Sequence, residues 1–174
     1  MRNLNEFSRP FEITQALKEP VPFKIEADRR ERAAVARRLD FLEVQALCAE
    51  GRVETAGRQV LRVRGRLTAR ILQRCVVTLE PVCSSVETAF ERLFRRGGAD
   101  AALVEVSVED PDLEPLVGDV LDLGEIVTEE LALAADPYPR APHADEALQK
   151  FGVVPEEEPL SPLRLALERL RDER

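Results

Sequence analysis

The most constraining feature of the sequence is an alternation of apolar and basic residues that runs from Gln59 to Glu80. Successive side chains of a strand point to opposite faces, so this alternation predicts one apolar face and one basic face. The apolar set comprises Leu61, Val63, Leu67, Ala69, Ile71, Cys75, Val77 and Leu79, and the basic set comprises Arg62, Arg64, Arg66, Arg70 and Arg74. A solvated basic face favours an antiparallel sheet. Strands usually have about 3–10 residues, so we expect a bend or break in this stretch. The alternation continues in the same register across Gly65, so no β-bulge is required there.

Capping and turn signals divide the rest of the chain into short elements. Asp28 with Glu31 three residues later predicts a helix over 29–39, and Asp122 with Glu125 predicts one over 123–134. Extended segments are expected over 7–11, 21–25, 41–49, 85–94 and 103–108. Residues 85–94 also fit a helical stripe, although we favour a strand, paired with 103–108 as a hairpin. Gly51 and Gly57 are expected to bracket turn or edge residues. A turn is expected at 95–98 and an acidic loop over 109–114.

The elements together predict one α+β domain over residues 1–140. Its antiparallel sheet could close toward a barrel, and two or three helices would pack on it. Residues 141–160 are acidic and contain prolines, which is typical of a linker. A short helix is expected over 161–174, as a C-terminal tail, because Ser161 and Pro162 precede a leucine-rich run.

The charge of the chain is divided unevenly along its 174 residues. The formal net charge is -8, but residues 1–100 carry 19 basic and 14 acidic side chains, while residues 101–174 carry 6 and 19. This asymmetry predicts one basic and one acidic surface, so the acidity of the whole chain does not exclude a nucleic-acid partner. No segment resembles a signal peptide or a membrane span, and we expect a cytoplasmic protein.

The residues with catalytic or metal-binding chemistry are sparse. His143 is the only histidine and lies in the expected linker, where it would be exposed and inert. Three cysteines at irregular spacing do not describe a disulfide framework or a zinc site, and Cys48 reads as a buried small apolar residue. The carboxylates Asp119, Asp122 and Glu125 are better explained by helix capping than by catalysis. We therefore expect no enzyme, cofactor or metal.

Two charged surfaces are the candidate binding sites. The five alternating arginines would repel one another unless an anionic partner, or acidic side chains from elsewhere in the chain, lay beside them. Exposed arginines also protect strands and aid solubility, so the two explanations stay open. If RNA is the partner, a stripe without aromatic residues would hold phosphate by charge and would not read bases. Glu125 and Glu129 on one helix face, and the run Glu156, Glu157 and Glu158, could contact a basic partner.

Two segments give the chain a family resemblance. The first contains Gly65-Arg-Leu-Thr-Ala69 and Cys75-Val-Val-Thr-Leu-Glu-Pro-Val82, and the second contains Gly118-Asp-Val-Leu-Asp-Leu-Gly-Glu125, Glu130-Leu-Ala-Leu133 and Pro137-Tyr-Pro-Arg140. In this order they resemble the YceD family, in its alphaproteobacterial form, over roughly residues 1–140. That family is associated with accumulation of the large-subunit ribosomal RNA and offers no established catalytic residues to carry over.

The chain departs from the family pattern at one place. Many members carry Cys-x-x-Cys immediately before Leu-Glu-Pro, whereas here Leu72 occupies the first cysteine position and three residues separate Cys75 from Leu79. The resemblance therefore does not carry a metal or redox role over to Cys75.

The resemblance implies a non-enzymatic ribosome biogenesis factor that supports large-subunit ribosomal RNA accumulation. Its partner would be that RNA or a ribosomal protein, with no membrane or small-molecule substrate. The alternative is a protein-interaction module that binds a basic partner through its acidic half without contacting RNA.

Overall fold

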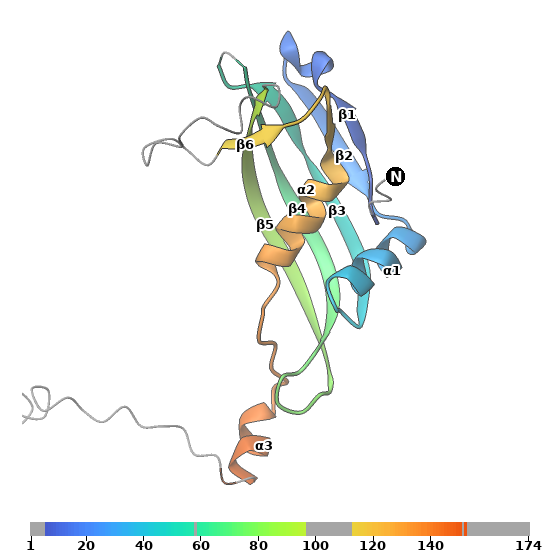
Figure 1. The fold of residues 1–174 in the computed structure, drawn as a ribbon. Coiled ribbons are helices and arrows are strands. Elements are labelled where there is room, and N and C mark those ends of the chain that lie inside the picture. The colour runs from blue at the N-terminus through green and yellow to red at the C-terminus, as the bar shows by residue number, and fades with distance from the viewer. Residues whose placement is uncertain (1–5, 58, 97–112, 151, 153–174) are drawn as a thin grey trace, which may run out of the picture. The chain divides into compact units, whose positions relative to one another are not determined.

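The computed structural model describes residues 6–57, 59–96, 113–150 and 152, and the chain divides into two units, residues 1–141 and 142–174. The first unit contains a five-stranded sheet of order β2-β3-β4-β5-β6 and a two-stranded sheet of β1 and β7 (Figure 1). The strands are β1 (Pro10–Glu12), β2 (Val21–Glu26), β3 (Glu43–Thr55), β4 (Val60–Arg74), β5 (Pro81–Arg96), β6 (Leu113–Leu116) and β7 (Val120–Asp122). The helices of this unit are the 3-10 helix η1 (Ile13–Leu17), α1 (Arg29–Arg38) and α2 (Leu123–Ala134). The α+β class predicted from the sequence is confirmed.

Strand β4 has the two faces that the alternation predicted. Leu61, Val63, Leu67 and Ile71 are fully buried, whereas the arginines between them are half-buried or exposed. The pairing of β4 with β5 runs from Val60↔Arg95 to Arg74↔Pro81 without a shift, so Gly65 carries no bulge. The expected break comes after Arg74, where residues 75–80 turn the chain into β5.

The sheet is mixed and not wholly antiparallel. Strands β2 to β5 pair antiparallel in sequence order, but β6 pairs parallel to β5. β6 includes Leu113 and Glu114, which the sequence assigned to an acidic loop, so that assignment was wrong for these two residues. The described sheet stays open, with β2 and β6 at its edges. The turn predicted over 95–98 was wrong for Arg95 and Arg96, which belong to β5. Residues 97 and 98 and the predicted strand over 103–108 lie outside the described residues.

A row of two glycines between two phenylalanines crosses four strands. Phe23 pairs with Gly51, Gly51 with Gly65, and Gly65 with Phe90. A Cβ on Gly51 would lie 2.2 Å from the Arg64 carbonyl oxygen, and one on Gly65 would lie 3.0 Å from the Phe90 ring. The prediction of a turn or edge at Gly51 was wrong, because this glycine lies inside a strand and permits a close approach.

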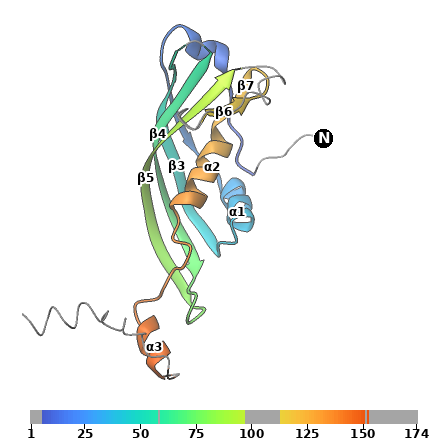
Figure 2. The same ribbon diagram turned by 60° about the vertical axis from the view of Figure 1, so that its left-hand side comes forward.

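Helices α1 and α2 cover one face of the sheet (Figure 2). α1 begins with the predicted capping box, in which the Asp28 carboxylate accepts from Arg30 N and Glu31 N while Glu31 accepts from Asp28 N. At the start of α2, Asp122 accepts from Gly124 N and Glu125 N. The helices contribute Val35, Ile126, Val127 and Leu131 to the core that also contains the apolar face of β4. We call this the inner face of the sheet and its opposite the outer face.

In the second unit the structure describes one helix, α3 (Ala144–Lys150). It lies within residues 141–160, where the sequence predicted a linker, and the exposed His143 precedes it. The helix predicted over 161–174 lies outside the described residues. No described helix is long and apolar enough to cross a membrane.

Candidate anionic-partner surface

The five arginines of β4 lie on the outer face, but their surroundings differ. Arg62 and Arg64 are half-buried, whereas Arg66, Arg70 and Arg74 are exposed. Pairing with β3 and β5 places acidic side chains beside the first three, because Glu54 lies opposite Arg62, Glu91 opposite Arg64 and Glu50 opposite Arg66. Acidic groups from neighbouring strands thus relieve part of the repulsion that the sequence predicted.

Glu54 is the centre of the most crowded ion cluster on this face. Its carboxylate lies 3.1 Å from Arg64 Nη2, 3.5 Å from Arg62 Nη1 and 3.9 Å from Arg52 Nε, and its side chain is only 14% exposed. Glu91 lies 3.4 Å from Arg62 Nε, but not in hydrogen-bond geometry. Three guanidinium groups share Glu54, and within the described part of the chain only Arg62 has a second carboxylate within ion-pair distance. Counted over these side chains, the cluster keeps excess positive charge.

Further along β4, the arginines are less well neutralised by carboxylates. Arg66 pairs with Glu87 on β5, and both side chains are more than half exposed, so the pair is worth little. Arg70 Nε donates to Cys83 Sγ, a weak acceptor, at 3.5 Å. Among the residues that the structure describes, Arg70 and Arg74 have no carboxylate within ion-pair distance.

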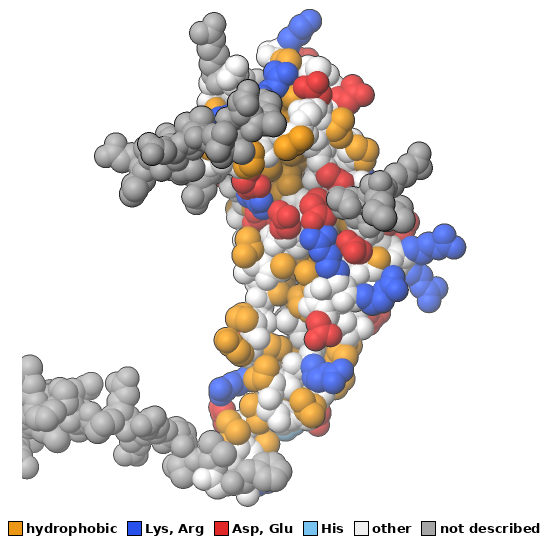
Figure 3. Space-filling model, viewed as in Figure 1, with side chains coloured by type: hydrophobic (Ala, Val, Ile, Leu, Met, Phe, Trp, Pro, Cys, Tyr) orange, Lys and Arg blue, Asp and Glu red, His pale blue; other side chains and the backbone are white. Residues whose placement is uncertain are grey.

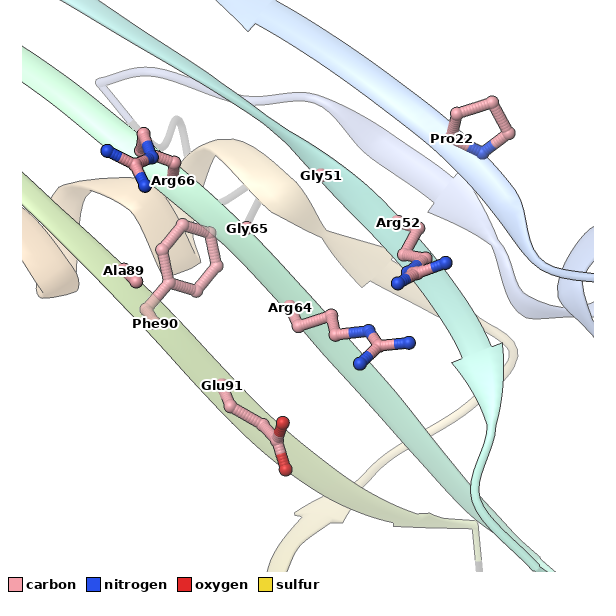
Figure 4. A pocket seen from close by; sticks show the side chains of 9 residues that line it. All are labelled: Pro22, Gly51, Arg52, Arg64, Gly65, Arg66, Ala89, Phe90 and Glu91. Carbon is pink, nitrogen blue, oxygen red and sulfur yellow. The ribbon is translucent and has the colours of Figure 1, made fainter.

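A groove of about 640 Å³ runs over the outer face where the two glycines lie. Figure 4 shows Arg52 and Arg64 beside each other on β3 and β4, with Arg66 farther along β4. Glu91 lines the same groove from β5. The backbone of Gly51 and Gly65 forms part of its floor, and an extended anionic chain could lie there between the arginines.

The predicted acidic helix face is occupied from within the protein. Arg38 of α1 donates to both carboxylate oxygens of Glu125, and this hydrogen bonding raises the pKa of Arg38 above its ordinary value. Arg92 of β5 binds Glu129 and Glu130 of α2, and also Glu114 of β6. Glu125 and Glu129 are both half-buried and both paired with arginines of this chain, so the expectation that they share an exposed helix face was wrong. Glu156, Glu157 and Glu158 lie outside the described residues.

Cys75 occupies the turn between β4 and β5 and is completely buried. Its sulfur accepts hydrogen bonds from Val77 N at 3.4 Å, Thr78 N at 3.3 Å and Ala141 N at 3.2 Å. Burial raises the pKa of this thiol, but the nearby Thr78 side chain and these backbone amides outweigh burial and lower the pKa to about 6. The turn therefore holds a thiolate near neutral pH.

The other two cysteines differ from Cys75. Cys48 is half-buried, so the prediction of full burial was wrong, and Cys83 is exposed. Within the described part of the chain no group of acidic, cysteine or histidine side chains could hold a metal ion.

The arginines of α1 were not predicted from the sequence as candidate binding residues. Arg29 lies three residues before Arg32 and eight before Arg37, a spacing that lets all three border one groove beside the helix. In the sequence this segment stands out for its cap and its apolar stripe, and the arginine spacing is the signal that could have shown a basic side.

Comparisons with known proteins place the chain in a family. A search of curated proteins and a search of solved structures each found no match. The model of the family described as large ribosomal RNA subunit accumulation protein YceD matches residues 63–171, from within β4 to near the end of the chain. Because this match covers more than half of the chain, the protein belongs to the YceD family.

Proposed function

We propose that this protein is a non-enzymatic ribosome biogenesis factor of the cytoplasm that supports large-subunit ribosomal RNA accumulation by binding RNA phosphate on the outer face of its sheet. The observation that carries the proposal is the sharing of one half-buried carboxylate, Glu54, by three arginines. An unneutralised guanidinium beside an open groove favours phosphate, which arginine can bind through two parallel hydrogen bonds.

The groove fits backbone contact better than base recognition. The exposed arginines Arg66, Arg70 and Arg74 continue along one strand, so successive phosphates of an extended RNA could follow β4. The one aromatic residue that lines the groove is Phe90, which is only 6% exposed and belongs to the core, so it offers no free ring on which bases could stack. The proposed contact is therefore electrostatic and independent of RNA sequence.

A salt titration of RNA binding tests the proposal. The variant R66Q/R70Q removes two exposed positive charges without touching the Glu54 cluster. K18Q/R30Q is the matched control, because it removes two exposed charges that do not lie on the outer face. With a labelled fragment of large-subunit ribosomal RNA, R66Q/R70Q should weaken binding and reduce the log–log salt slope by about 1.4, at about 0.7 per lost phosphate contact. In cells, R66Q/R70Q should restore ribosomal RNA less well than the control variant.

The opposite result would contradict the proposal. If R66Q/R70Q binds RNA with the affinity and salt slope of the control, the outer face is not the RNA surface. The protein could instead bind a basic ribosomal protein and lose it when Glu156, Glu157 and Glu158 are neutralised. In that case the interaction-module alternative replaces the RNA-binding proposal.

A further inference from the structure

The arginines of α1 fall into two groups according to their partners. Arg38 binds Glu125 and Glu6, on the side of the helix toward α2. Arg29 and Arg37 are exposed, and no carboxylate within the described ranges lies within ion-pair distance of either. Basic side chains accordingly project from the α1 region of the surface in Figure 3.

Arg29, Arg32 and Arg37 border a groove of about 390 Å³ between α1 and the start of β3. Arg32 Nη1 donates to the Ala27 carbonyl oxygen at 2.8 Å, which holds this guanidinium beside the helix. Ala33 and Ala36 lie on the same side of α1 and leave its surface low between the arginines. The rise of 1.5 Å per residue separates Arg29 from Arg37 by about 12 Å along the axis, so they can contact different phosphates.

The far wall of the groove has a different character. It consists of residues 41–45, in which Phe41 is half-buried and Leu42 is 41% exposed. Glu43 is the acidic residue of this lining, and it accepts a hydrogen bond from Gln45 Nε2 at 3.2 Å. Three arginines thus face an apolar wall that contains a single carboxylate.

We propose that this groove binds single-stranded RNA, with phosphates on Arg29, Arg32 and Arg37 and a base against Phe41 and Leu42. The inference rests on the proposed function for its choice of RNA, and it adds a second surface, on the helix side of the sheet. Single-stranded RNA is bound by combining a basic groove with aromatic or apolar contact to unstacked bases, and this groove offers both. A duplex keeps its bases stacked and would use the arginines alone.

The test uses the full-length chain and a short single-stranded RNA. R29E/R37E should weaken binding and reduce the salt slope by about 1.4. K18E/R30E is the matched control, because it reverses two exposed charges outside the groove, one of them on α1. E43Q should strengthen binding, because it removes the carboxylate that repels phosphate. Thermal unfolding checks that each variant is folded. If R29E/R37E does not fold, E43Q still tests the groove.

Each outcome decides between the two surfaces. If R29E/R37E and E43Q both bind RNA as the control does, the groove is not an RNA site; if R66Q/R70Q still weakens binding, the outer-face proposal survives. Loss of binding in R29E/R37E with none in R66Q/R70Q supports the groove and contradicts the outer face. A duplex of the same length should bind less tightly. If oligoglutamate displaces the RNA at equal charge concentration, the groove recognises acidic protein and the RNA inference is overturned.

Discussion

At the scale of single residues, the outer face depends on how one carboxylate is shared. Glu54 is only 14% exposed and lies within 3.9 Å of Arg52, Arg62 and Arg64. The Nε atoms of Arg62 and Arg64 are buried without a hydrogen-bond acceptor, so these guanidinium groups are incompletely satisfied. The same residues that supply positive charge for a partner therefore depend on Glu54 for their stability in the folded protein.

Glu54→Gln separates these two roles. It removes the negative charge while keeping a side chain of similar size, so the three arginines should repel one another. We expect a loss of about 2 kcal/mol in the free energy of unfolding, measured by urea denaturation, together with tighter RNA binding at low salt. Glu87→Gln is the control, because the exposed Glu87–Arg66 pair should contribute no more than about 1 kcal/mol. Equal effects of the two substitutions would contradict a special role for Glu54.

Cys75 gives a second prediction at this scale, through pH. Its pKa is lowered from an ordinary value of 9.0 to about 6, so the folded state binds a proton less readily than the unfolded state. The resulting stabilisation is complete above the unfolded pKa and is lost as the pH falls through the folded pKa. The melting temperature of the wild type relative to Cys75→Ala should therefore rise between pH 6 and pH 9. A constant difference across that range would show that Cys75 is not a thiolate in the folded protein.

At the scale of elements, features that depend on neighbouring residues were easier to predict from the sequence than features that depend on long-range strand pairing. The β4 alternation and both helix caps were found from the sequence, because strand parity and capping depend on neighbouring residues. The parallel partner β6 was missed, since its pairing depends on where the chain returns after β5. The acidic partners of the arginines could have been predicted from the sequence, because a β3–β4 hairpin that turns near Gly57 places Glu54 opposite Arg62.

The glycine row is the element-scale feature with the sharpest consequence. Gly51→Ala would place a Cβ 2.2 Å from the Arg64 carbonyl oxygen and 2.6 Å from the Gly65 Cα, both of them backbone atoms that cannot turn aside. Strands β3 and β4 would have to separate, at a cost of about 2–3 kcal/mol or more. Thr68→Ala, also within β4 but on the outer face, should cost about 1 kcal/mol or less. Chemical denaturation of both variants measures the difference, and similar losses would contradict the close approach.

At the scale of the whole molecule, the charge is distributed so that a net acidic chain can have basic surfaces. At moderate salt, screening limits the range over which an exposed charge acts to about 8–10 Å. A partner at the outer face therefore responds more to the arginines near it than to the net charge of the chain. Among the described residues, the core side chains lie between Phe7 and Ala135, within the first unit. Residues 142–174 contain eight acidic and five basic residues, so they contribute net negative charge.

Removing residues 142–174 should therefore leave a folded protein that binds RNA more tightly. The truncation subtracts three net negative charges, so we expect a few-fold gain in affinity at low salt that fades as salt screens the repulsion. E156Q/E157Q/E158Q in the full-length chain removes the same amount of charge without changing the length, and it should reproduce most of the gain. Binding measured across a salt series distinguishes the outcomes. If truncation weakens RNA binding while the triple substitution does not, the C-terminal segment contributes contacts of its own, and simple charge repulsion is the wrong description of its effect.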